Sequence, residues 1–441
     1  MSRRVRSKPP PSAVDSAFLG VSLCFLLSGV AGLVYQMVWM RYLSTVFGTS
    51  ELAIVTVLVA YMGGLAVGAW IASRLVHKLQ SPIRLYAILE AVIAASALLV
   101  PLLLRAVGGL HQLLLGGKEA PPPDGGVLEA LSLLGLGCMV LLIPTACMGA
   151  TLPILASGVI RRRAQIGRRV GWLYALNTGG AVVGTVLAAF FLIPRFGLWQ
   201  TSFVGVALNI SVAVLGWFVA LRAPVPAEAE EPEAPGERGT SISPAPGRAF
   251  SLVILVVMLV SGGLSFAYEV LWARLLSHLL GGSLYAFATM LAAFLAGIAV
   301  GGLAGAALAK NHRRSCLWLA GVEIATGLLT AIVFLSVSSG NFAERGDESL
   351  GSLALLCGLI LMPATLCIGA TFPLAVRGLT EDHREAGRWA GRVYAWNTIG
   401  AIVGAVGAGY FLIPALGFAG TFKWAIFGNL LLGTVVLFVM S

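Results

Sequence analysis

Uninterrupted apolar runs of about 20 residues or more recur along the whole chain, and they limit the possible fold more than any other feature. A helix of ~20 apolar residues is long enough to cross a hydrocarbon layer of ~30 Å. The runs do not alternate as the strands of a membrane barrel do. Charged residues make up only 11% of the 441 residues, whereas soluble domains contain about 25%. We therefore predict an all-α polytopic membrane protein.

Twelve such runs can be placed, which predicts about twelve transmembrane helices. Their approximate positions are 17–41, 52–73, 83–105, 127–157, 170–194, 198–221, 250–274, 284–309, 316–337, 350–376, 390–414 and 420–440. The first run is longer than the apolar region of a signal peptide, so we interpret it as a membrane helix.

The distribution of Lys and Arg predicts an orientation in the membrane. If the N-terminus is cytoplasmic, most of the 29 Lys and Arg residues are cytoplasmic too. The outer side then holds only Arg41, Arg105, Lys118, Arg195, Arg274, Arg345 and Lys423. This bias predicts a multi-pass protein of the cytoplasmic (inner) membrane with both termini in the cytoplasm. The net charge of +10 is then a topology signal, and we expect no nucleic-acid partner.

The sequence also repeats itself. The heptad YQMVWMR at 35–41 returns as YEVLWAR at 268–274, an offset of 233 residues. The stretch 170–197 returns at 390–417, an offset of 220 residues, because an outer loop is longer in the first half. Both copies start on the same side of the membrane. We therefore expect two parallel six-helix repeats, the relation between the halves of major facilitator transporters.

The repeat suggests how the chain is organised. A basic cytoplasmic tail is expected at 1–16, a first six-helix bundle at 17–222 and a second at 250–441. Between the bundles, 223–249 is rich in Pro, Ala and Glu and has almost no large apolar residues. Such a composition cannot bury a core, so we predict a disordered cytoplasmic linker.

Several stretches resemble a known family. GATLPIL at 149–155 and GATFPLA at 369–375 are two of them, and GRVYAWNTIGAIVGAVGAGYFLIPALG at 391–417 is a third. They resemble the membrane half of fused MFS/spermidine synthases, which implies a major facilitator fold and a link to polyamines. That family carries a cytoplasmic aminopropyltransferase-like domain after the last span. No Gly-rich loop followed by an acidic residue is found here to hold a nucleoside cofactor. We therefore expect no cofactor, and a separate soluble aminopropyltransferase-like subunit is a possible partner.

Acidic residues inside the predicted spans are the first candidates for a site. Glu90 and Glu323 are equivalent at the 233 offset, and each lies seven residues into its span, or ~10 Å. A carboxylate at that depth costs several kcal/mol, about 3, unless it is paired, protonated or hydrated. It can either hold neighbouring helices together or bind a cation or proton.

Four further polar residues are expected at the same depth. They form two equivalent pairs at the 220 offset, three residues apart within each pair. With the two glutamates they predict a polar layer for solute or proton binding: Glu90, Glu323, Tyr174, Asn177, Tyr394 and Asn397. For each asparagine the alternative is an interhelical hydrogen bond.

The repeated heptads lie at the outer ends of the first and seventh spans. Aromatic residues and long arginine side chains are ordinary at a membrane interface. The arginines nevertheless occupy, twice, the side that the positive-inside rule depletes. Glu269 also stands where the first half has Gln36. We treat these residues as outer-face gating candidates: Tyr35, Gln36, Arg41, Tyr268, Glu269 and Arg274.

Two functions remain open. The first is a transporter of a small cationic, polyamine-like solute, with the two bundles rocking around the membrane glutamates. The second is a non-transporting membrane anchor for the aminopropyltransferase-like subunit. Glutamates that line one central cleft favour transport, whereas glutamates buried inside each half favour the anchor. An enzyme is a weak third reading, because we find no metal-ligand pattern and no catalytic set.

Overall fold

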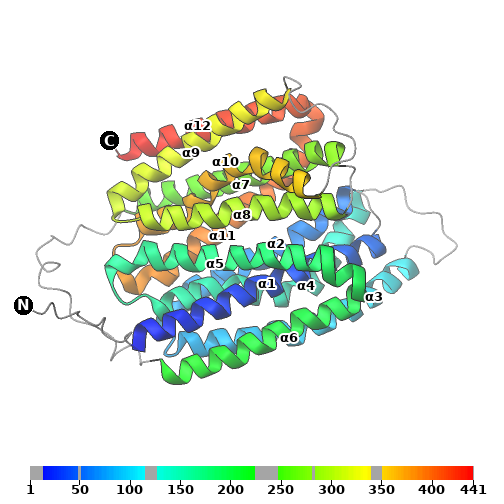
Figure 1. Cartoon of the computed structure of the whole chain (residues 1–441), viewed down its shortest axis with the longest axis horizontal. Coiled ribbons are helices and arrows are strands. Elements are labelled where there is room, and N and C mark those ends of the chain that lie inside the picture. Colours follow the sequence, from blue (N-terminus) through cyan, green and yellow to red (C-terminus); the bar gives the residue numbers. More distant parts are fainter. Residues whose placement is uncertain are drawn as a thin grey trace, which may run out of the picture.

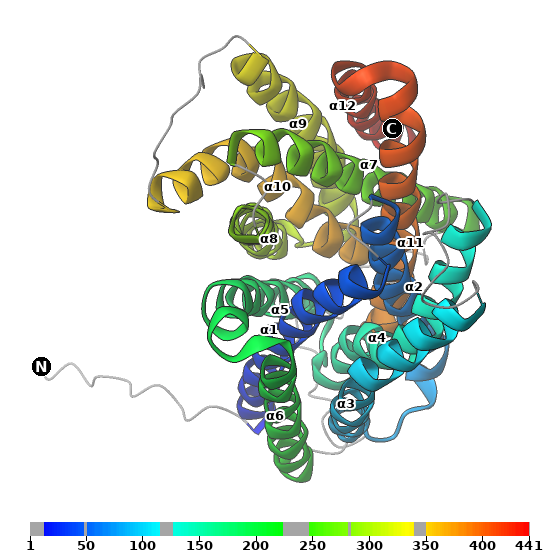
Figure 2. The ribbon, with the colours of Figure 1, turned by 90° about the vertical axis from the view of Figure 1, so that its right-hand side faces the viewer.

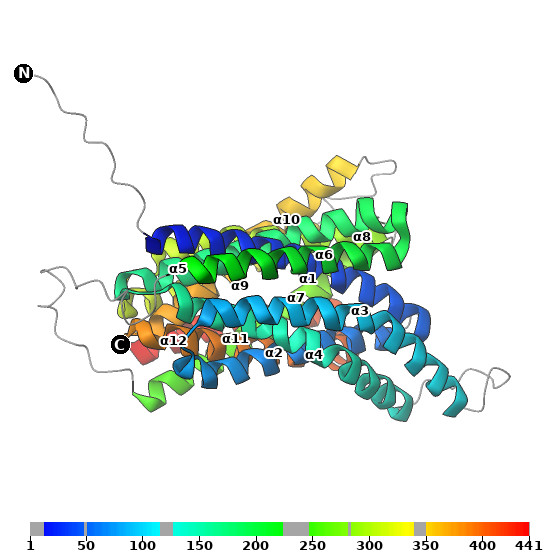
Figure 3. The same ribbon diagram turned by 90° about the horizontal axis from the view of Figure 1, so that it is seen from below.

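The computed structural model describes residues 13–47, 51–114, 127–223, 247–280, 284–338 and 350–440. Most of the predicted tail and linker lie outside these residues. The described residues form twelve α-helices, most of which run along the long axis of the molecule (Figures 1 and 3). The helices are α1 (Ala13–Phe47), α2 (Glu51–Leu75), α3 (Pro82–Leu114), α4 (Val127–Val159), α5 (Ile166–Val186), α6 (Ile193–Arg222), α7 (Arg248–Leu280), α8 (Leu284–Leu308), α9 (His312–Ser338), α10 (Leu350–Leu379), α11 (Ala386–Val406) and α12 (Ile413–Met440).

Ten apolar helical runs are long enough to cross a membrane, and two of them are long enough to cross twice. The run Arg163–Arg222 has 60 residues and His383–Met440 has 58. A straight helix of 60 residues would be ~90 Å long, about three times the hydrocarbon thickness. Each run instead turns back at a glycine with positive φ, 76° at Gly197 and 68° at Gly417. Ten runs therefore provide twelve crossings, as the sequence predicts.

Glycines explain why the same helices pair in both halves. In the first half α1 packs on α5, and in the second α7 packs on α11. A Cβ atom at Gly180 would lie 2.0 Å from the carbonyl oxygen of Leu26, and one at Gly400 would lie 1.7 Å from that of Leu259. Only glycine permits such close backbone contact. The repeated helix pairs confirm the predicted six-helix repeats.

The two halves meet through α5 against α8 and through α2 against α11 (Figure 2). We call the end of the bundle where α1 begins and α12 ends the terminal end, and the opposite end the far end (Figure 1). A Cβ at Gly171 would lie 2.5 Å from the Cβ of Ala306, and one at Gly391 would lie 2.7 Å from the carbonyl oxygen of Ala69. These residues belong to the terminal parts of their helices, so the halves are in close contact at the terminal end.

An ion pair joins the halves at the same end. Arg163, just before α5, pairs with Glu381, just before α11. The two positions lie in equivalent loops of the repeats, and the loops have diverged in charge: Arg161, Arg162 and Arg163 in one, Glu381 and Asp382 in the other. Opposite charges thus reinforce the close helix contacts.

Candidate functional site

A cavity of about 250 Å³ lies between the two halves. Its lining comes from α1, α2, α4 and α5 of the first half and from α7, α8 and α11 of the second. Along α5, Gly171 contacts the other half, and Tyr174, Asn177 and Thr178 then follow as lining residues. The same order holds along α11, from Gly391 to the lining residue Tyr394. The cavity therefore lies next to the terminal-end contacts, on the far side of them.

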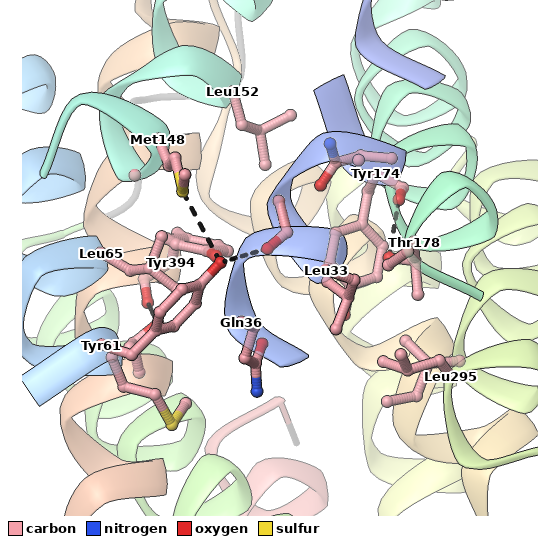
Figure 4. A pocket seen from close by; sticks show the side chains of 18 of the residues that line it. Leu33, Gln36, Tyr61, Leu65, Met148, Leu152, Tyr174, Thr178, Leu295 and Tyr394 are labelled. Carbon is pink, nitrogen blue, oxygen red and sulfur yellow. Dashed lines mark hydrogen bonds between the residues drawn. The ribbon is translucent and has the colours of Figure 1, made fainter. Parts of the chain in front are cut away.

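Figure 4 shows how the lining side chains are arranged. Tyr61 and Tyr394 lie on one side of the cavity, and Tyr174, Thr178 and Leu295 lie on the other. Gln36 and Leu33, from successive turns of α1, lie between them.

Several polar lining groups are already hydrogen-bonded to the protein. The Tyr61 hydroxyl donates to the carbonyl oxygen of Gly32 at 3.3 Å. The Asn177 amide donates to the carbonyl oxygen of Phe25 at 3.1 Å. The equivalent Asn397 donates to that of Met258 at 3.2 Å. Each asparagine thus holds its helix against the first helix of its own half while also lining the cavity.

Glu269 is the only charged side chain among the described lining residues. It makes no hydrogen bond or ion pair to any described residue. Gln36, its equivalent in the first repeat, also lines the cavity without such a bond. Both lie seven residues from the far ends of their spans, Ser16–Leu43 and Arg248–Leu276, or ~10 Å. The sequence placed these two among the outer-face residues, and the structure adds that they face the central cavity.

Glu90 and Glu323 are in a different place. Neither lines the cavity, and both are almost completely buried. Glu90 accepts hydrogen bonds from Ser28 of α1 at 2.7 Å and from the amide of Asn209 of α6. Glu323 accepts one from the amide of Asn429 of α12 at 2.6 Å. Each glutamate therefore joins helices inside its own half, which is the arrangement we associated with a packing role.

The expected polar layer is thus divided in two. Tyr174, Asn177, Tyr394 and Asn397 line the cavity together. The two glutamates point away from the cavity. Glu90 of α3 points toward α1 and α6, and Glu323 of α9 points toward α12. Residues at equal depth on different helices can point in different directions, because the direction of each side chain depends on how its own helix is rotated about its axis.

Three residues of these sites were not predicted from the sequence. Asn209 and Asn429 bind the buried glutamates, and they are equivalent at the 220 offset, so the repeat could have revealed them. Tyr61 lines the cavity, but its equivalent is Phe294, and a lone tyrosine in an apolar run gives no signal.

The tyrosines of the two heptads pack inside the halves. Tyr35 is fully buried and stacks on Trp39 with 5.2 Å between ring centroids. The Tyr268 hydroxyl donates to the side-chain oxygen of Asn429 at 2.9 Å. Arg41 is exposed and Arg274 is partly buried. Gating by Tyr35, Arg41, Tyr268 or Arg274 therefore stays a prediction.

Comparisons with known proteins identify the fold. No family model and no curated protein matches the chain, so the resemblance to fused MFS/spermidine synthases stays a prediction. Solved structures do match. One is the major facilitator transporter FucP in an outward conformation, with a TM-score of 0.63 and 12% identity over 98% of this chain and 100% of that one. A structure of the fucose:proton symporter FucP of E. coli has a TM-score of 0.57 at 13% identity, over 98% of this chain and 100% of that one.

A third similar structure is the proton:xylose symporter XylE bound to 6-bromo-6-deoxy-D-glucose. Its TM-score is 0.55 at 15% identity, covering 96% of this chain and 95% of that one. The match extends over nearly the whole of both chains. The chain is a multi-pass membrane protein with the fold of the major facilitator superfamily.

Proposed function

We propose that this chain is a transporter that moves a small cationic solute across the cytoplasmic membrane by alternating access. The observation that carries the proposal is the central cavity between the two halves, in which Glu269 is the only charged side chain among the described lining residues. A cavity enclosed by two repeats, next to the contacts that close one end, suits a solute that must reach both sides in turn.

The contacts between the halves suggest how the cavity could open. At the terminal end they involve glycine and alanine surfaces and the Arg163–Glu381 pair, with side chains 38% and 13% exposed. Such a pair contributes only about 0.2–1 kcal/mol. Surfaces in which small residues make the closest contacts can separate by rigid-body rocking of 17–222 against 250–441. We place the terminal end in the cytoplasm, following the distribution of Lys and Arg.

Charge supports a cation rather than an anion. The described lining holds one carboxylate and no Lys, Arg or His. An anion would meet a like charge in a low-dielectric space, whereas a cation would meet a partner. The comparisons lend no support to a cationic solute or to a polyamine, so the proposal rests on the charge of the lining alone.

A second candidate is proton-coupled transport of a neutral sugar. The similar structures include a fucose:proton symporter and a proton:xylose symporter. In that case Glu269 would carry the proton, and the amides and hydroxyls of the lining would bind the sugar. The anchor for a soluble subunit is less well supported. The buried positions of Glu90 and Glu323 fit it, but an anchor has no need of a central cavity with an unpaired carboxylate.

Uptake into proteoliposomes tests the proposal. The purified chain would be reconstituted, and uptake of labelled benzylamine, putrescine, spermidine and xylose measured. The control is Arg163→Cys/Glu381→Cys in a background without the native cysteines, joined by a short bifunctional maleimide. We expect uptake to stop in the sample treated with the linker and to continue in the same variant without the linker. No uptake of any solute, together with co-purification of a soluble aminopropyltransferase-like protein, would favour the anchor.

A further inference from the structure

Most polar side chains that line the cavity are hydrogen-bonded within the protein. Ser28 donates to Glu90, Asn177 and Asn397 donate to backbone carbonyls, and Tyr61 donates to Gly32. Three lining threonines are satisfied in the same way by carbonyl oxygens within their own helices: Thr151, Thr178 and Thr398. These groups have partners without any ligand.

Four lining side chains remain without a hydrogen bond to any described residue. They are the carboxylate of Glu269, the amide of Gln36 and the hydroxyls of Tyr174 and Tyr394. Polar groups shielded from bulk water are normally hydrogen-bonded, and leaving one without a partner costs about 1–3 kcal/mol. These four are therefore the groups that solvent or a ligand must satisfy. Only one of them carries a charge.

We infer that the cavity binds a singly charged organic amine, with its ammonium group at Glu269. This inference rests on the proposed function and narrows its solute class. An ammonium group has three donors and needs acceptors, which the Glu269 carboxylate supplies, and the Gln36 amide oxygen is a further acceptor in the same lining. The rest of the molecule would meet the apolar residues Leu33, Phe294 and Leu295, and then the neutral hydroxyls of Tyr174 and Tyr394.

The number of charges on the ligand follows from the difference between the two repeats at Gln36 and Glu269. Glu269 and Gln36 occupy equivalent positions, so two carboxylates at this level would need only the single change Gln36→Glu. With Gln36 present, a second ammonium would have no anionic partner among the described lining residues. An unpaired charge away from water is costly. A diamine such as putrescine is therefore a poorer ligand than a monoamine.

Equilibrium binding to the full chain in nanodiscs tests the inference. The probes are benzylamine with one charge, putrescine with two and xylose with none. The parent should bind benzylamine at least tenfold more tightly than either of the others. Glu269→Gln should weaken benzylamine binding at least tenfold. Gln36→Glu should strengthen putrescine binding at least tenfold.

Glu90→Gln is the matched control, because it removes a carboxylate that lies within a membrane helix but is fully buried and does not line the cavity. It should leave benzylamine binding within twofold of the parent. Benzylamine binding that survives Glu269→Gln overturns the inference, as does a parent that binds xylose or putrescine in preference. Benzylamine binding that depends on Glu269, without uptake into proteoliposomes, would instead contradict the proposed transport and still support the inferred binding site.

Discussion

The tight contact at Gly171 gives a direct test of rocking between the halves. A Cβ built at Gly171 would lie 2.5 Å from the Cβ of Ala306 and 2.9 Å from that of Pro373. Carbon atoms in good contact are about 3.5–4.0 Å apart. Gly171→Ala therefore requires α5 to move away from α8 and α10 by roughly 1 Å. Both neighbours belong to the second half, so the strain affects the closed terminal end and not the first half itself.

The size of the effect can be estimated. Inserting a methyl group into a well-packed contact costs about 1–3 kcal/mol. Because 1.4 kcal/mol is a tenfold change in an equilibrium constant, the ratio of closed to open terminal ends should fall by about 5- to 140-fold. The ratio of open to closed terminal ends should therefore be larger in the variant than in the parent by this factor.

Distances between spin labels would measure the change. Labels at Ala164→Cys and Lys310→Cys lie on exposed residues of opposite halves at the terminal end. The expected result is a longer distance in Gly171→Ala than in the parent. Gly179→Ala is the control, because a Cβ there meets no atom within 4 Å. A Gly171→Ala distribution that matches the parent would refute the reasoning, and so would an equal change in Gly179→Ala.

Three further outcomes are expected. Arg163→Glu and Glu381→Arg should each weaken closure by about 0.2–1 kcal/mol, and the double exchange should restore the parent label distance; a double variant that stays open contradicts this. Glu90→Leu should leave the Asn209 amide buried without its acceptor, at a cost of about 1–3 kcal/mol, seen as a lower melting temperature in detergent than Glu90→Gln. Gly197→Ala places a side chain at φ 76° and should cost about 1–2 kcal/mol; a melting temperature equal to the parent's would show that the turn tolerates it.

The repeat made much of the fold predictable. Spans, helix pairs and turns recur at two offsets, and the paired glycines follow the same offsets, Gly180 with Gly400 and Gly197 with Gly417. Separate spans were predicted at 170–194 and 198–221, and the boundary between them includes Gly197, where the structure turns back. Length and hydropathy are properties of the chain itself, so they need no knowledge of neighbouring helices.

The site was only partly predictable, because depth in the membrane does not give the direction of a side chain. Glu90 and Asn177 were expected in one layer, yet one is buried against α6 and the other lines the cavity. Glu269 was singled out as a charge difference between repeats, but its place in the central cavity depends on how α7 is rotated. That rotation is set by packing against α11 and α12, which the sequence alone does not show.

Equivalent positions of the two repeats differ in how far they have changed, depending on whether they pack inside a half or line the cavity. Groups that hold each half together are the same in both: Glu90 with Asn209, and Glu323 with Asn429. Packing inside a repeat poses the same physical problem twice, so the same residues solve it. Cavity positions have changed, from Gln36 to Glu269 and from Tyr61 to Phe294. A solute without twofold symmetry cannot place its one charged group against two equivalent carboxylates at once. One of the two would remain without a partner at a cost of about 1–3 kcal/mol. A difference such as that between Gln36 and Glu269 is therefore what binding of an asymmetric solute with one charge requires, and an anchor that binds no solute has no such requirement.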